Sequence, residues 1–146
     1  MKQIAELIEG QMLTVVEPSS NVRSAARTMS ERNIGAVAVV DAGRLTGIFS
    51  ERDLMSRVVA AGLDPDQTNV DMVMSKELVV ADPKDDLDSA LQKMHAIHAR
   101  HLPVVDDGKL VGMISLRDLL EVDDLEQRKR ATFLNELVTY SPDYDS

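Results

Sequence analysis

Apolar residues recur at helical spacing in two stretches of this 146-residue chain. In each stretch they fall at positions i, i+3, i+4 and i+7, which places them on one face of a helix. The members are Val22, Ala25, Ala26 and Met29 in the first stretch, and Leu87, Ala90, Leu91 and Met94 in the second. The polar triplets "SSN" and "KDD" directly before them supply capping residues. Each stretch therefore predicts an amphipathic helix that buries one stripe.

Short apolar runs surround each helix and predict strands. Residues 13–16 and 78–81 precede the helices and are soon followed by a proline, which suits the close of a strand. After the helices come "AVAVV" (36–40) and "LPVVD" (102–106), each followed by Asp-x-Gly and a further run, "LTGIF" or "LVGMI". This order predicts a hairpin with Gly43 or Gly108 at the position that needs a positive φ.

The last strand of each set leads into a second helix, and the first copy of this helix is expected to stop before Gly62. A shift of 65 residues, the separation of Val15 from Val80, aligns the two sets without a gap. The pattern predicts an α/β fold of two pseudo-symmetric β-α-β-β-α units packed into one module, because one such unit leaves much surface unburied. The expected boundaries are 4–62, 69–122, and a C-terminal helix and tail over 123–146.

Composition narrows the possible functions. The formal net charge of −9 argues against general binding of nucleic acids or anionic membranes. The chain has no cysteine, which excludes disulfides and cysteine-based zinc sites. It also lacks an apolar run of signal-peptide or membrane-spanning type, so we expect a soluble, cytoplasmic protein.

The junction between the last strand and the second helix carries a repeated motif, "GIFSERDL" and "GMISLRDL". A serine here lies beside the free N–H groups of the first helical turn, where a phosphate is favoured. The arginine can add a forked donor, and the ionised aspartate can accept from both ribose hydroxyls. The residues are Ser50, Arg52 and Asp53 in the first copy, and Ser115, Arg117 and Asp118 in the second. The plainer interpretation is a capping box without a ligand.

Two tandem units of this order, with Gly-hydrophobic-x-Ser-x-x-Asp after each hairpin and "LPVVD" before the second, resemble the paired CBS domains called a Bateman module. The resemblance covers about residues 4–122 and implies a regulatory, non-enzymatic protein that binds AMP, ADP, ATP, NAD or S-adenosylmethionine between the units. By the same resemblance, a slot for adenine is expected from Val15, Gly35, Ala36, Val37, Val80, Arg100, His101, Leu102 and Pro103. Arg100 and His101 are expected to reach a phosphate in the second cleft only.

Other candidate sites are weaker. The histidines at 95, 98 and 101 lack the further ligands of a tetrahedral metal site, and no spacing indicates a catalytic triad, so neither a metal nor an enzyme is expected. Apolar residues of the C-terminal helix form a stripe that we expect to be covered by a second chain in a homodimer. They are Leu125, Phe133, Leu134, Leu137 and Val138. An effector protein would then be bound in trans. The alternative function is a scaffold whose clefts stay empty.

Overall fold

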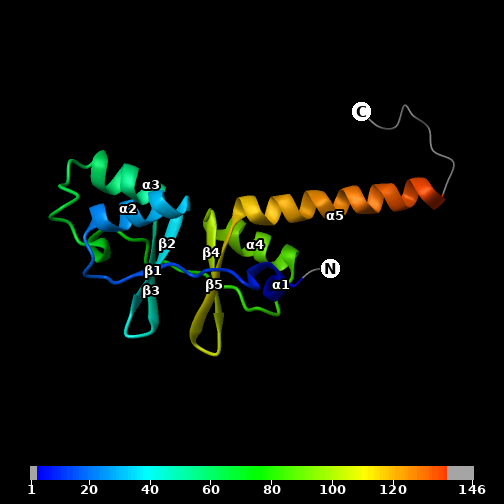
Figure 1. The fold of residues 1–146 in the computed structure, drawn as a ribbon, viewed down its shortest axis with the longest axis horizontal. Helices are drawn as coiled ribbons and strands as arrows, with labels where there is room; N and C mark the ends of the chain where they lie inside the picture. The colour runs from blue at the N-terminus through cyan, green and yellow to red at the C-terminus, as the bar shows by residue number, and fades with distance from the viewer. Residues whose placement is uncertain (1–2, 138–146) are drawn as a thin grey trace.

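The computed structural model describes residues 3–137 of the chain, with the side chains of 126 and 129–137 excepted. The elements are α1 (Ile4–Ile8), β1 (Val15–Val16), α2 (Val22–Arg32), β2 (Ala36–Asp41), β3 (Arg44–Ser50), α3 (Glu51–Asp53), the π-helix η1 (Leu54–Val59), the 3₁₀-helix η2 (Val70–Met72), α4 (Leu87–Ile97), β4 (His101–Asp106), β5 (Lys109–Ser115) and α5 (Leu116–Leu137). The two hairpins β2–β3 and β4–β5 lie side by side, each with its own helices (Figure 1). The predicted α/β class with two similar units is confirmed.

The hairpins of the two units pair their strands in the same register, but the units differ in their first strand. In the first unit, β1 runs parallel to β2 and pairs Val15 with Ala38 and Val16 with Val39, while β2 is antiparallel to β3. In the second unit, β4 pairs with β5, and the expected strand at 78–81 shrinks to a single parallel bridge between Ala81 and Val104. Pro103 stands where the first unit has Ala38, and proline has no N–H to donate to a neighbouring strand. The second sheet therefore cannot repeat the longer ladder.

The helices α2 and α4 form as their apolar spacing predicts. The Asn21 side chain caps α2 by accepting from Ser24 N at 2.8 Å, and Asp86 caps α4 by accepting from Ser89 N at 2.9 Å. The i, i+3 and i+7 members of each predicted stripe are buried, namely Val22, Ala25 and Met29 on α2, and Leu87, Ala90 and Met94 on α4. The i+4 members, Ala26 and Leu91, are half-buried. Each helix thus turns one face toward its own hairpin.

The second helices of the two units differ in length and in type. In the first unit a short α-helical turn, α3, widens into η1, and Gly62 follows with a φ of 73°. In the second unit, α5 runs without a break through the segment expected to be a separate C-terminal helix, and it projects from the body (Figure 1). Leu125 of the predicted stripe is 48% exposed. The side chains of Phe133, Leu134 and Leu137, together with Val138 and the polar tail at 141–146, lie outside the described residues.

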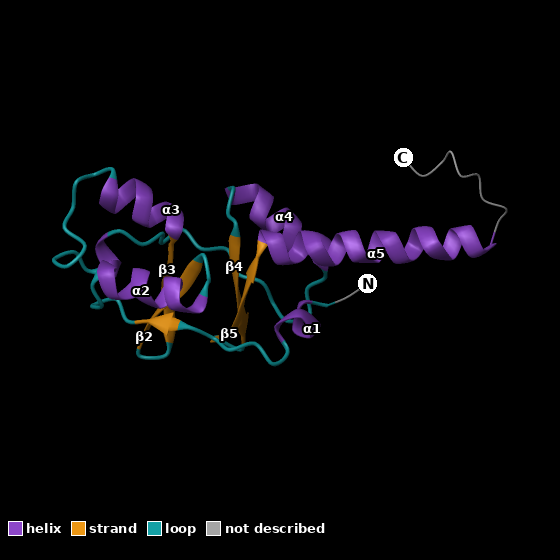
Figure 2. Ribbon diagram, turned by 45° about the horizontal axis from the view of Figure 1, so that its top comes forward, coloured by secondary structure: helices purple, strands orange, loops and turns teal. Residues whose placement is uncertain are grey.

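The first residues of each expected unit pack on the core of the other unit. Ile4 of α1 is fully buried among residues of the second unit, and α1 lies beside β5 rather than beside β1 (Figure 2). Reciprocally, Val70, Val73 and Met74 of the linker after η1 belong to the core of the first unit. The chain therefore crosses between the units twice, which ties them into one body. Among the described residues, no helix has the length and apolarity to cross a bilayer.

Candidate functional site

Two open hollows lie between the units. The first cleft, of about 1160 Å³, is lined by the first Ser-x-x-Asp motif, by linker residues 74–79 and by residues 97–101 of the second unit. The second cleft, of about 1250 Å³, is lined by the second motif, by residues 11–14 and by residues 33–36 of the first unit. Each cleft thus combines the helix start of one unit with the opening of a strand from the other. Glu51, Arg100 and His101 line both clefts.

The residues predicted for the adenine slot separate into three groups. Gly35 and Ala36 line the second cleft, whereas Arg100 and His101 line both. The start of β4 lies between the two hollows, and the expectation that these two residues reach a phosphate in the second cleft only stays a prediction. The remaining predicted residues do not line either hollow. Val37 and Leu102 are core residues, Pro103 is buried, and Val15 and Val80 are 47% and 38% exposed outside the linings.

In the first cleft, Ser50 and Asp53 form a closed capping box at the start of α3. Asp53 N donates to Ser50 Oγ at 3.2 Å, and Ser50 N donates to Asp53 Oδ2 at 2.9 Å. The Ser50 hydroxyl also donates to Asp53 Oδ2, at 3.0 Å. The Asp53 side chain is only 7% exposed. This aspartate is a buried, hydrogen-bonded group rather than an open one.

In the second cleft, the corresponding pair is far more open. Asp118 N donates to Ser115 Oγ at 3.0 Å, while Ser115 N lies 3.4 Å from Asp118 Oδ2, which is a weak return bond. Asp118 is exposed, and so is Arg117, whose Nε lies 3.3 Å from Glu121 Oε1. The Asp118 carboxylate therefore retains acceptor sites that face the hollow.

The amino-acid sequence of each unit matches a known protein family. The family model described as the CBS domain matches residues 10–60 and 70–124. The chain belongs to the CBS-domain family. The resemblance noted from the repeated motif is thereby confirmed, and CBS domains in general are regulatory rather than catalytic modules.

Curated and solved CBS-domain proteins resemble the chain over most of its length. The CBS domain-containing protein YhcV of Bacillus subtilis is 40% identical over 119 residues, which are 82% of this chain and 84% of YhcV. A proposed signal-transduction protein with CBS domains from Burkholderia ambifaria superposes with a TM-score of 0.81 at 30% identity, over 86% of this chain and 96% of that one. A CBS domain protein from Pyrobaculum aerophilum, solved in complex with AMP, has a TM-score of 0.73 at 25% identity, over 80% and 89% of the two chains.

His101 occupies the wall shared by the two CBS clefts. Burial lowers the pKa of its imidazole below the ordinary value, against the opposing effect of the Glu51 and Asp118 carboxylates, and Arg100 lowers it further. A Cβ atom on Gly35 would lie 3.4 Å from both His101 Nε2 and Glu51 Oε1, at ordinary contact distance, so Gly35 of the first unit lies next to His101 of the second. The imidazole is therefore a neutral donor and acceptor between the clefts near neutral pH.

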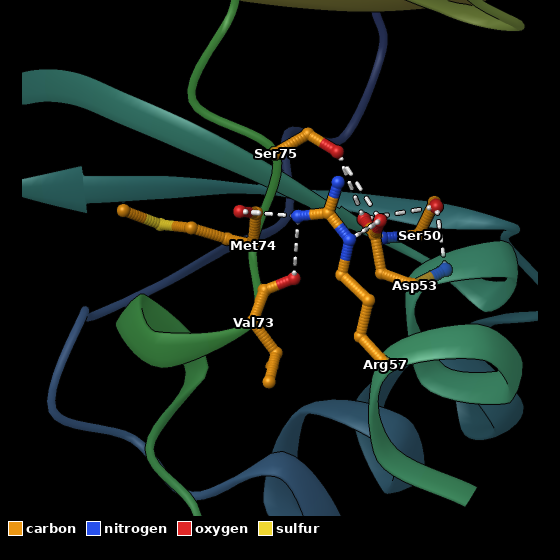
Figure 3. Close-up of polar contacts among 6 residues, drawn as sticks. All are labelled: Ser50, Asp53, Arg57, Val73, Met74 and Ser75. Carbon is orange, nitrogen blue, oxygen red and sulfur yellow. Dashed lines mark hydrogen bonds and ion pairs between the residues drawn. The ribbon is translucent and has the colours of Figure 1, made fainter. Parts of the chain in front are cut away.

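Two residues at the first cleft were not predicted from the sequence. Ser75 Oγ donates to Asp53 Oδ1 at 3.1 Å, and Arg57 Nε lies 3.7 Å from the same oxygen (Figure 3). The i, i+4 spacing of Asp53 and Arg57 on a predicted helix was a signal that could have identified this ion pair. Ser75 carries no such signal, because it is brought to Asp53 only by the return of the linker onto the first unit.

Proposed function

We propose that this tandem CBS-domain protein binds an adenosine nucleotide between its units and signals the occupancy of the site to a partner protein. The observation that carries the proposal is the Asp118 carboxylate, which is exposed to a hollow at the start of the long helix α5. Because an ionised carboxylate only accepts hydrogen bonds, it suits the two neighbouring hydroxyls of a ribose.

The other groups of the second cleft fit the remaining parts of a nucleotide. The first-turn N–H groups of α5 favour a phosphate, and the exposed Arg117 guanidinium can add a forked donor to it. Gly35 has no side chain and Ala36 has only a methyl group, so these two lining residues leave room for a flat base. The AMP-bound relative from Pyrobaculum aerophilum supports an adenosine ligand of this kind. Titration with AMP, ATP, NAD and S-adenosylmethionine measures which of the four is preferred.

The proposed output is a change in how modules associate with each other and with a partner in trans. Apolar side chains of the two second helices are exposed at the surface: Met55 and Val59 on η1 are 61% and 66% exposed, and Leu120 on α5 is 51% exposed. Exposed apolar residues of this kind suit a contact between copies. We therefore include a cytoplasmic homodimer in the proposal, and no catalysed reaction. Sedimentation velocity of the protein alone and with ligand would measure the association.

Isothermal titration with AMP, ATP, NAD and S-adenosylmethionine tests the proposal. Asp118→Ala should weaken binding of the preferred ligand at least about tenfold, since hydrogen bonds to a charged group contribute roughly 1.5–3 kcal/mol. Replacing AMP by 2′-deoxy-AMP should also weaken binding, because the carboxylate loses one donor.

The matched control is Asp88→Ala, which removes an exposed first-turn carboxylate of α4 that lines neither cleft. This variant should bind as the unmodified protein does. If none of the four compounds binds at millimolar concentration, the ligand-free scaffold is the better description and the Ser-x-x-Asp pairs act only as caps.

A further inference from the structure

The carboxylate of Asp53 is engaged within the protein by three hydrogen-bond donors and one ion pair. Oδ2 accepts from the backbone N and the hydroxyl of Ser50, and Oδ1 faces the Ser75 hydroxyl at 3.1 Å and Arg57 Nε at 3.7 Å (Figure 3). Two carboxylate oxygens offer about four lone-pair sites. A ribose at this position would therefore have to displace donors that are already in place.

Arg57 and Ser75, which contact Asp53 from outside the Ser-x-x-Asp motif, are held in place by hydrogen bonds with backbone groups. Arg57 Nη1 donates to Met74 O at 3.1 Å and to Val73 O at 3.3 Å (Figure 3). Ser75 forms an antiparallel bridge with Ile48, in which each backbone N donates to the other's carbonyl oxygen at 2.8 and 3.0 Å. Freeing the Asp53 carboxylate for a ligand thus requires the linker at 73–75 to shift or these side chains to turn away.

The second unit lacks both groups at the equivalent positions. A forward shift of 65 residues places Val122 opposite Arg57, and the same shift backward places Gly10 opposite Ser75. Gly10 lies between Ile8 and Gln11, which contact Gly112 and Met113 of the second unit. Neither Val122 nor Gly10 has a polar side chain, and Val122 instead packs against the second core. Among the described residues, the only hydrogen-bond donor to the Asp118 carboxylate is Ser115 N, at 3.4 Å. The side chains of Arg57 and Ser75 therefore account for the difference between the two clefts.

From this asymmetry we infer that the ribonucleotide binds in the second cleft alone, and that Arg57 and Ser75 close the first cleft to ribose by engaging Asp53. The inference rests on the proposed function and specifies which site performs it. The first Ser-x-x-Asp pair then serves to fasten the linker between the units. The linker contacts form part of the wall of the first cleft, so this fastening also fixes the shape of that hollow.

The stoichiometry of AMP binding tests the inference without engineering the first cleft. The unmodified protein should bind one AMP per chain, and Asp118→Ala should weaken the whole titration at least tenfold with no component of unchanged affinity. Two equivalents per chain, with half of the binding surviving in Asp118→Ala, would overturn the inference and leave the proposed function standing. Absence of any AMP binding would overturn both.

A gain-of-site variant tests the roles of the two side chains. Arg57→Val combined with Ser75→Gly installs in the first unit the residues that the second unit has at these positions. The double variant should bind a second AMP, provided that its circular dichroism spectrum matches that of the unmodified protein. Ser75→Gly alone, which keeps Arg57 and its contacts with the linker, is the milder version. A folded double variant that still binds one AMP would show that these residues do not close the cleft.

Discussion

Truncation of Ile4 to alanine tests whether the N-terminal segment belongs to the second unit. Ile4 is fully buried, and its neighbours in that core include Ala81, Leu87 and Leu102. The backbone of α1 is fastened to the same unit, because Ile4 N donates to Asp85 O and Ala5 N to Pro83 O, both at 2.8 Å. The side chain therefore cannot relax into solvent without breaking these contacts.

The expected loss of stability follows from this complete burial. The substitution removes three side-chain carbons, each worth about 0.8 kcal/mol of transfer free energy, or roughly 2.4 kcal/mol in all. The cavity left behind adds to this value, because a core closes over a deletion only in part. We expect Ile4→Ala to lower the free energy of unfolding by about 3–4 kcal/mol.

Urea denaturation followed by circular dichroism at one protein concentration would measure the change, with Met12→Ala as the control. Met12 belongs to the same N-terminal segment but is 75% exposed, so its truncation should cost less than about 0.5 kcal/mol. Hydrogen exchange adds a local measurement, and in Ile4→Ala it should accelerate in β4–β5 before β2–β3. A cost no larger than that of Met12→Ala, or faster exchange confined to β2–β3, would refute the cross-packing.

Two further predictions concern pH and turn conformation. Burial lowers the pKa of His101 in the folded state, where Arg100, Glu51 and Asp118 are its charged neighbours. The contribution of His101 to stability is therefore fully present above its unfolded pKa of about 6.5. This contribution is lost as the pH falls from there through the folded pKa. His101→Gln should therefore flatten the dependence of the urea midpoint on pH between about 7.5 and 5.5, and an unchanged slope would contradict this reasoning. Ala42 adopts a φ of 51° in the β2–β3 turn, so Ala42→Asn should stabilise the protein by roughly 0.5–1 kcal/mol in the same assay. Asp107→Asn, in the equivalent turn at a φ of 50°, is the control and should change stability by less than about 0.5 kcal/mol; an equal gain in both variants would count against the explanation.

Much of each unit could be predicted from local pattern. The stripes on α2 and α4 follow from the spacing of apolar residues, and their caps follow from Asn21 and Asp86. The reduced first strand of the second unit also has a local cause, since Pro103 lacks an N–H. The widening of the helix after Asp53 into a π-helix, and the unbroken course of α5, were not predicted, because apolar spacing does not distinguish these helical forms.

The motif alone does not determine which of the two Ser-x-x-Asp pairs is open to a ligand. Both pairs make the same local capping bond, from the aspartate N to the serine Oγ, as their identical spacing predicts. Whether the carboxylate is then available depends on Ser75, which lies 22 residues from Asp53 in sequence. Hydrogen bonds between residues so far apart follow from how the linker returns, which no periodicity encodes.

The sequence by itself determined the duplication, the order of elements in each unit and the positions of the two motifs, because these depend on side-chain spacing and on capping within a few residues. Only the tertiary structure decided which unit each connecting segment joins and which motif is left open to a ligand. Ile4 and Val70 are both apolar residues at the start of an expected unit, and each could in principle cover either sheet. Packing against the opposite unit buries both completely, and that crossing also brings Ser75 to Asp53 while leaving Asp118 exposed.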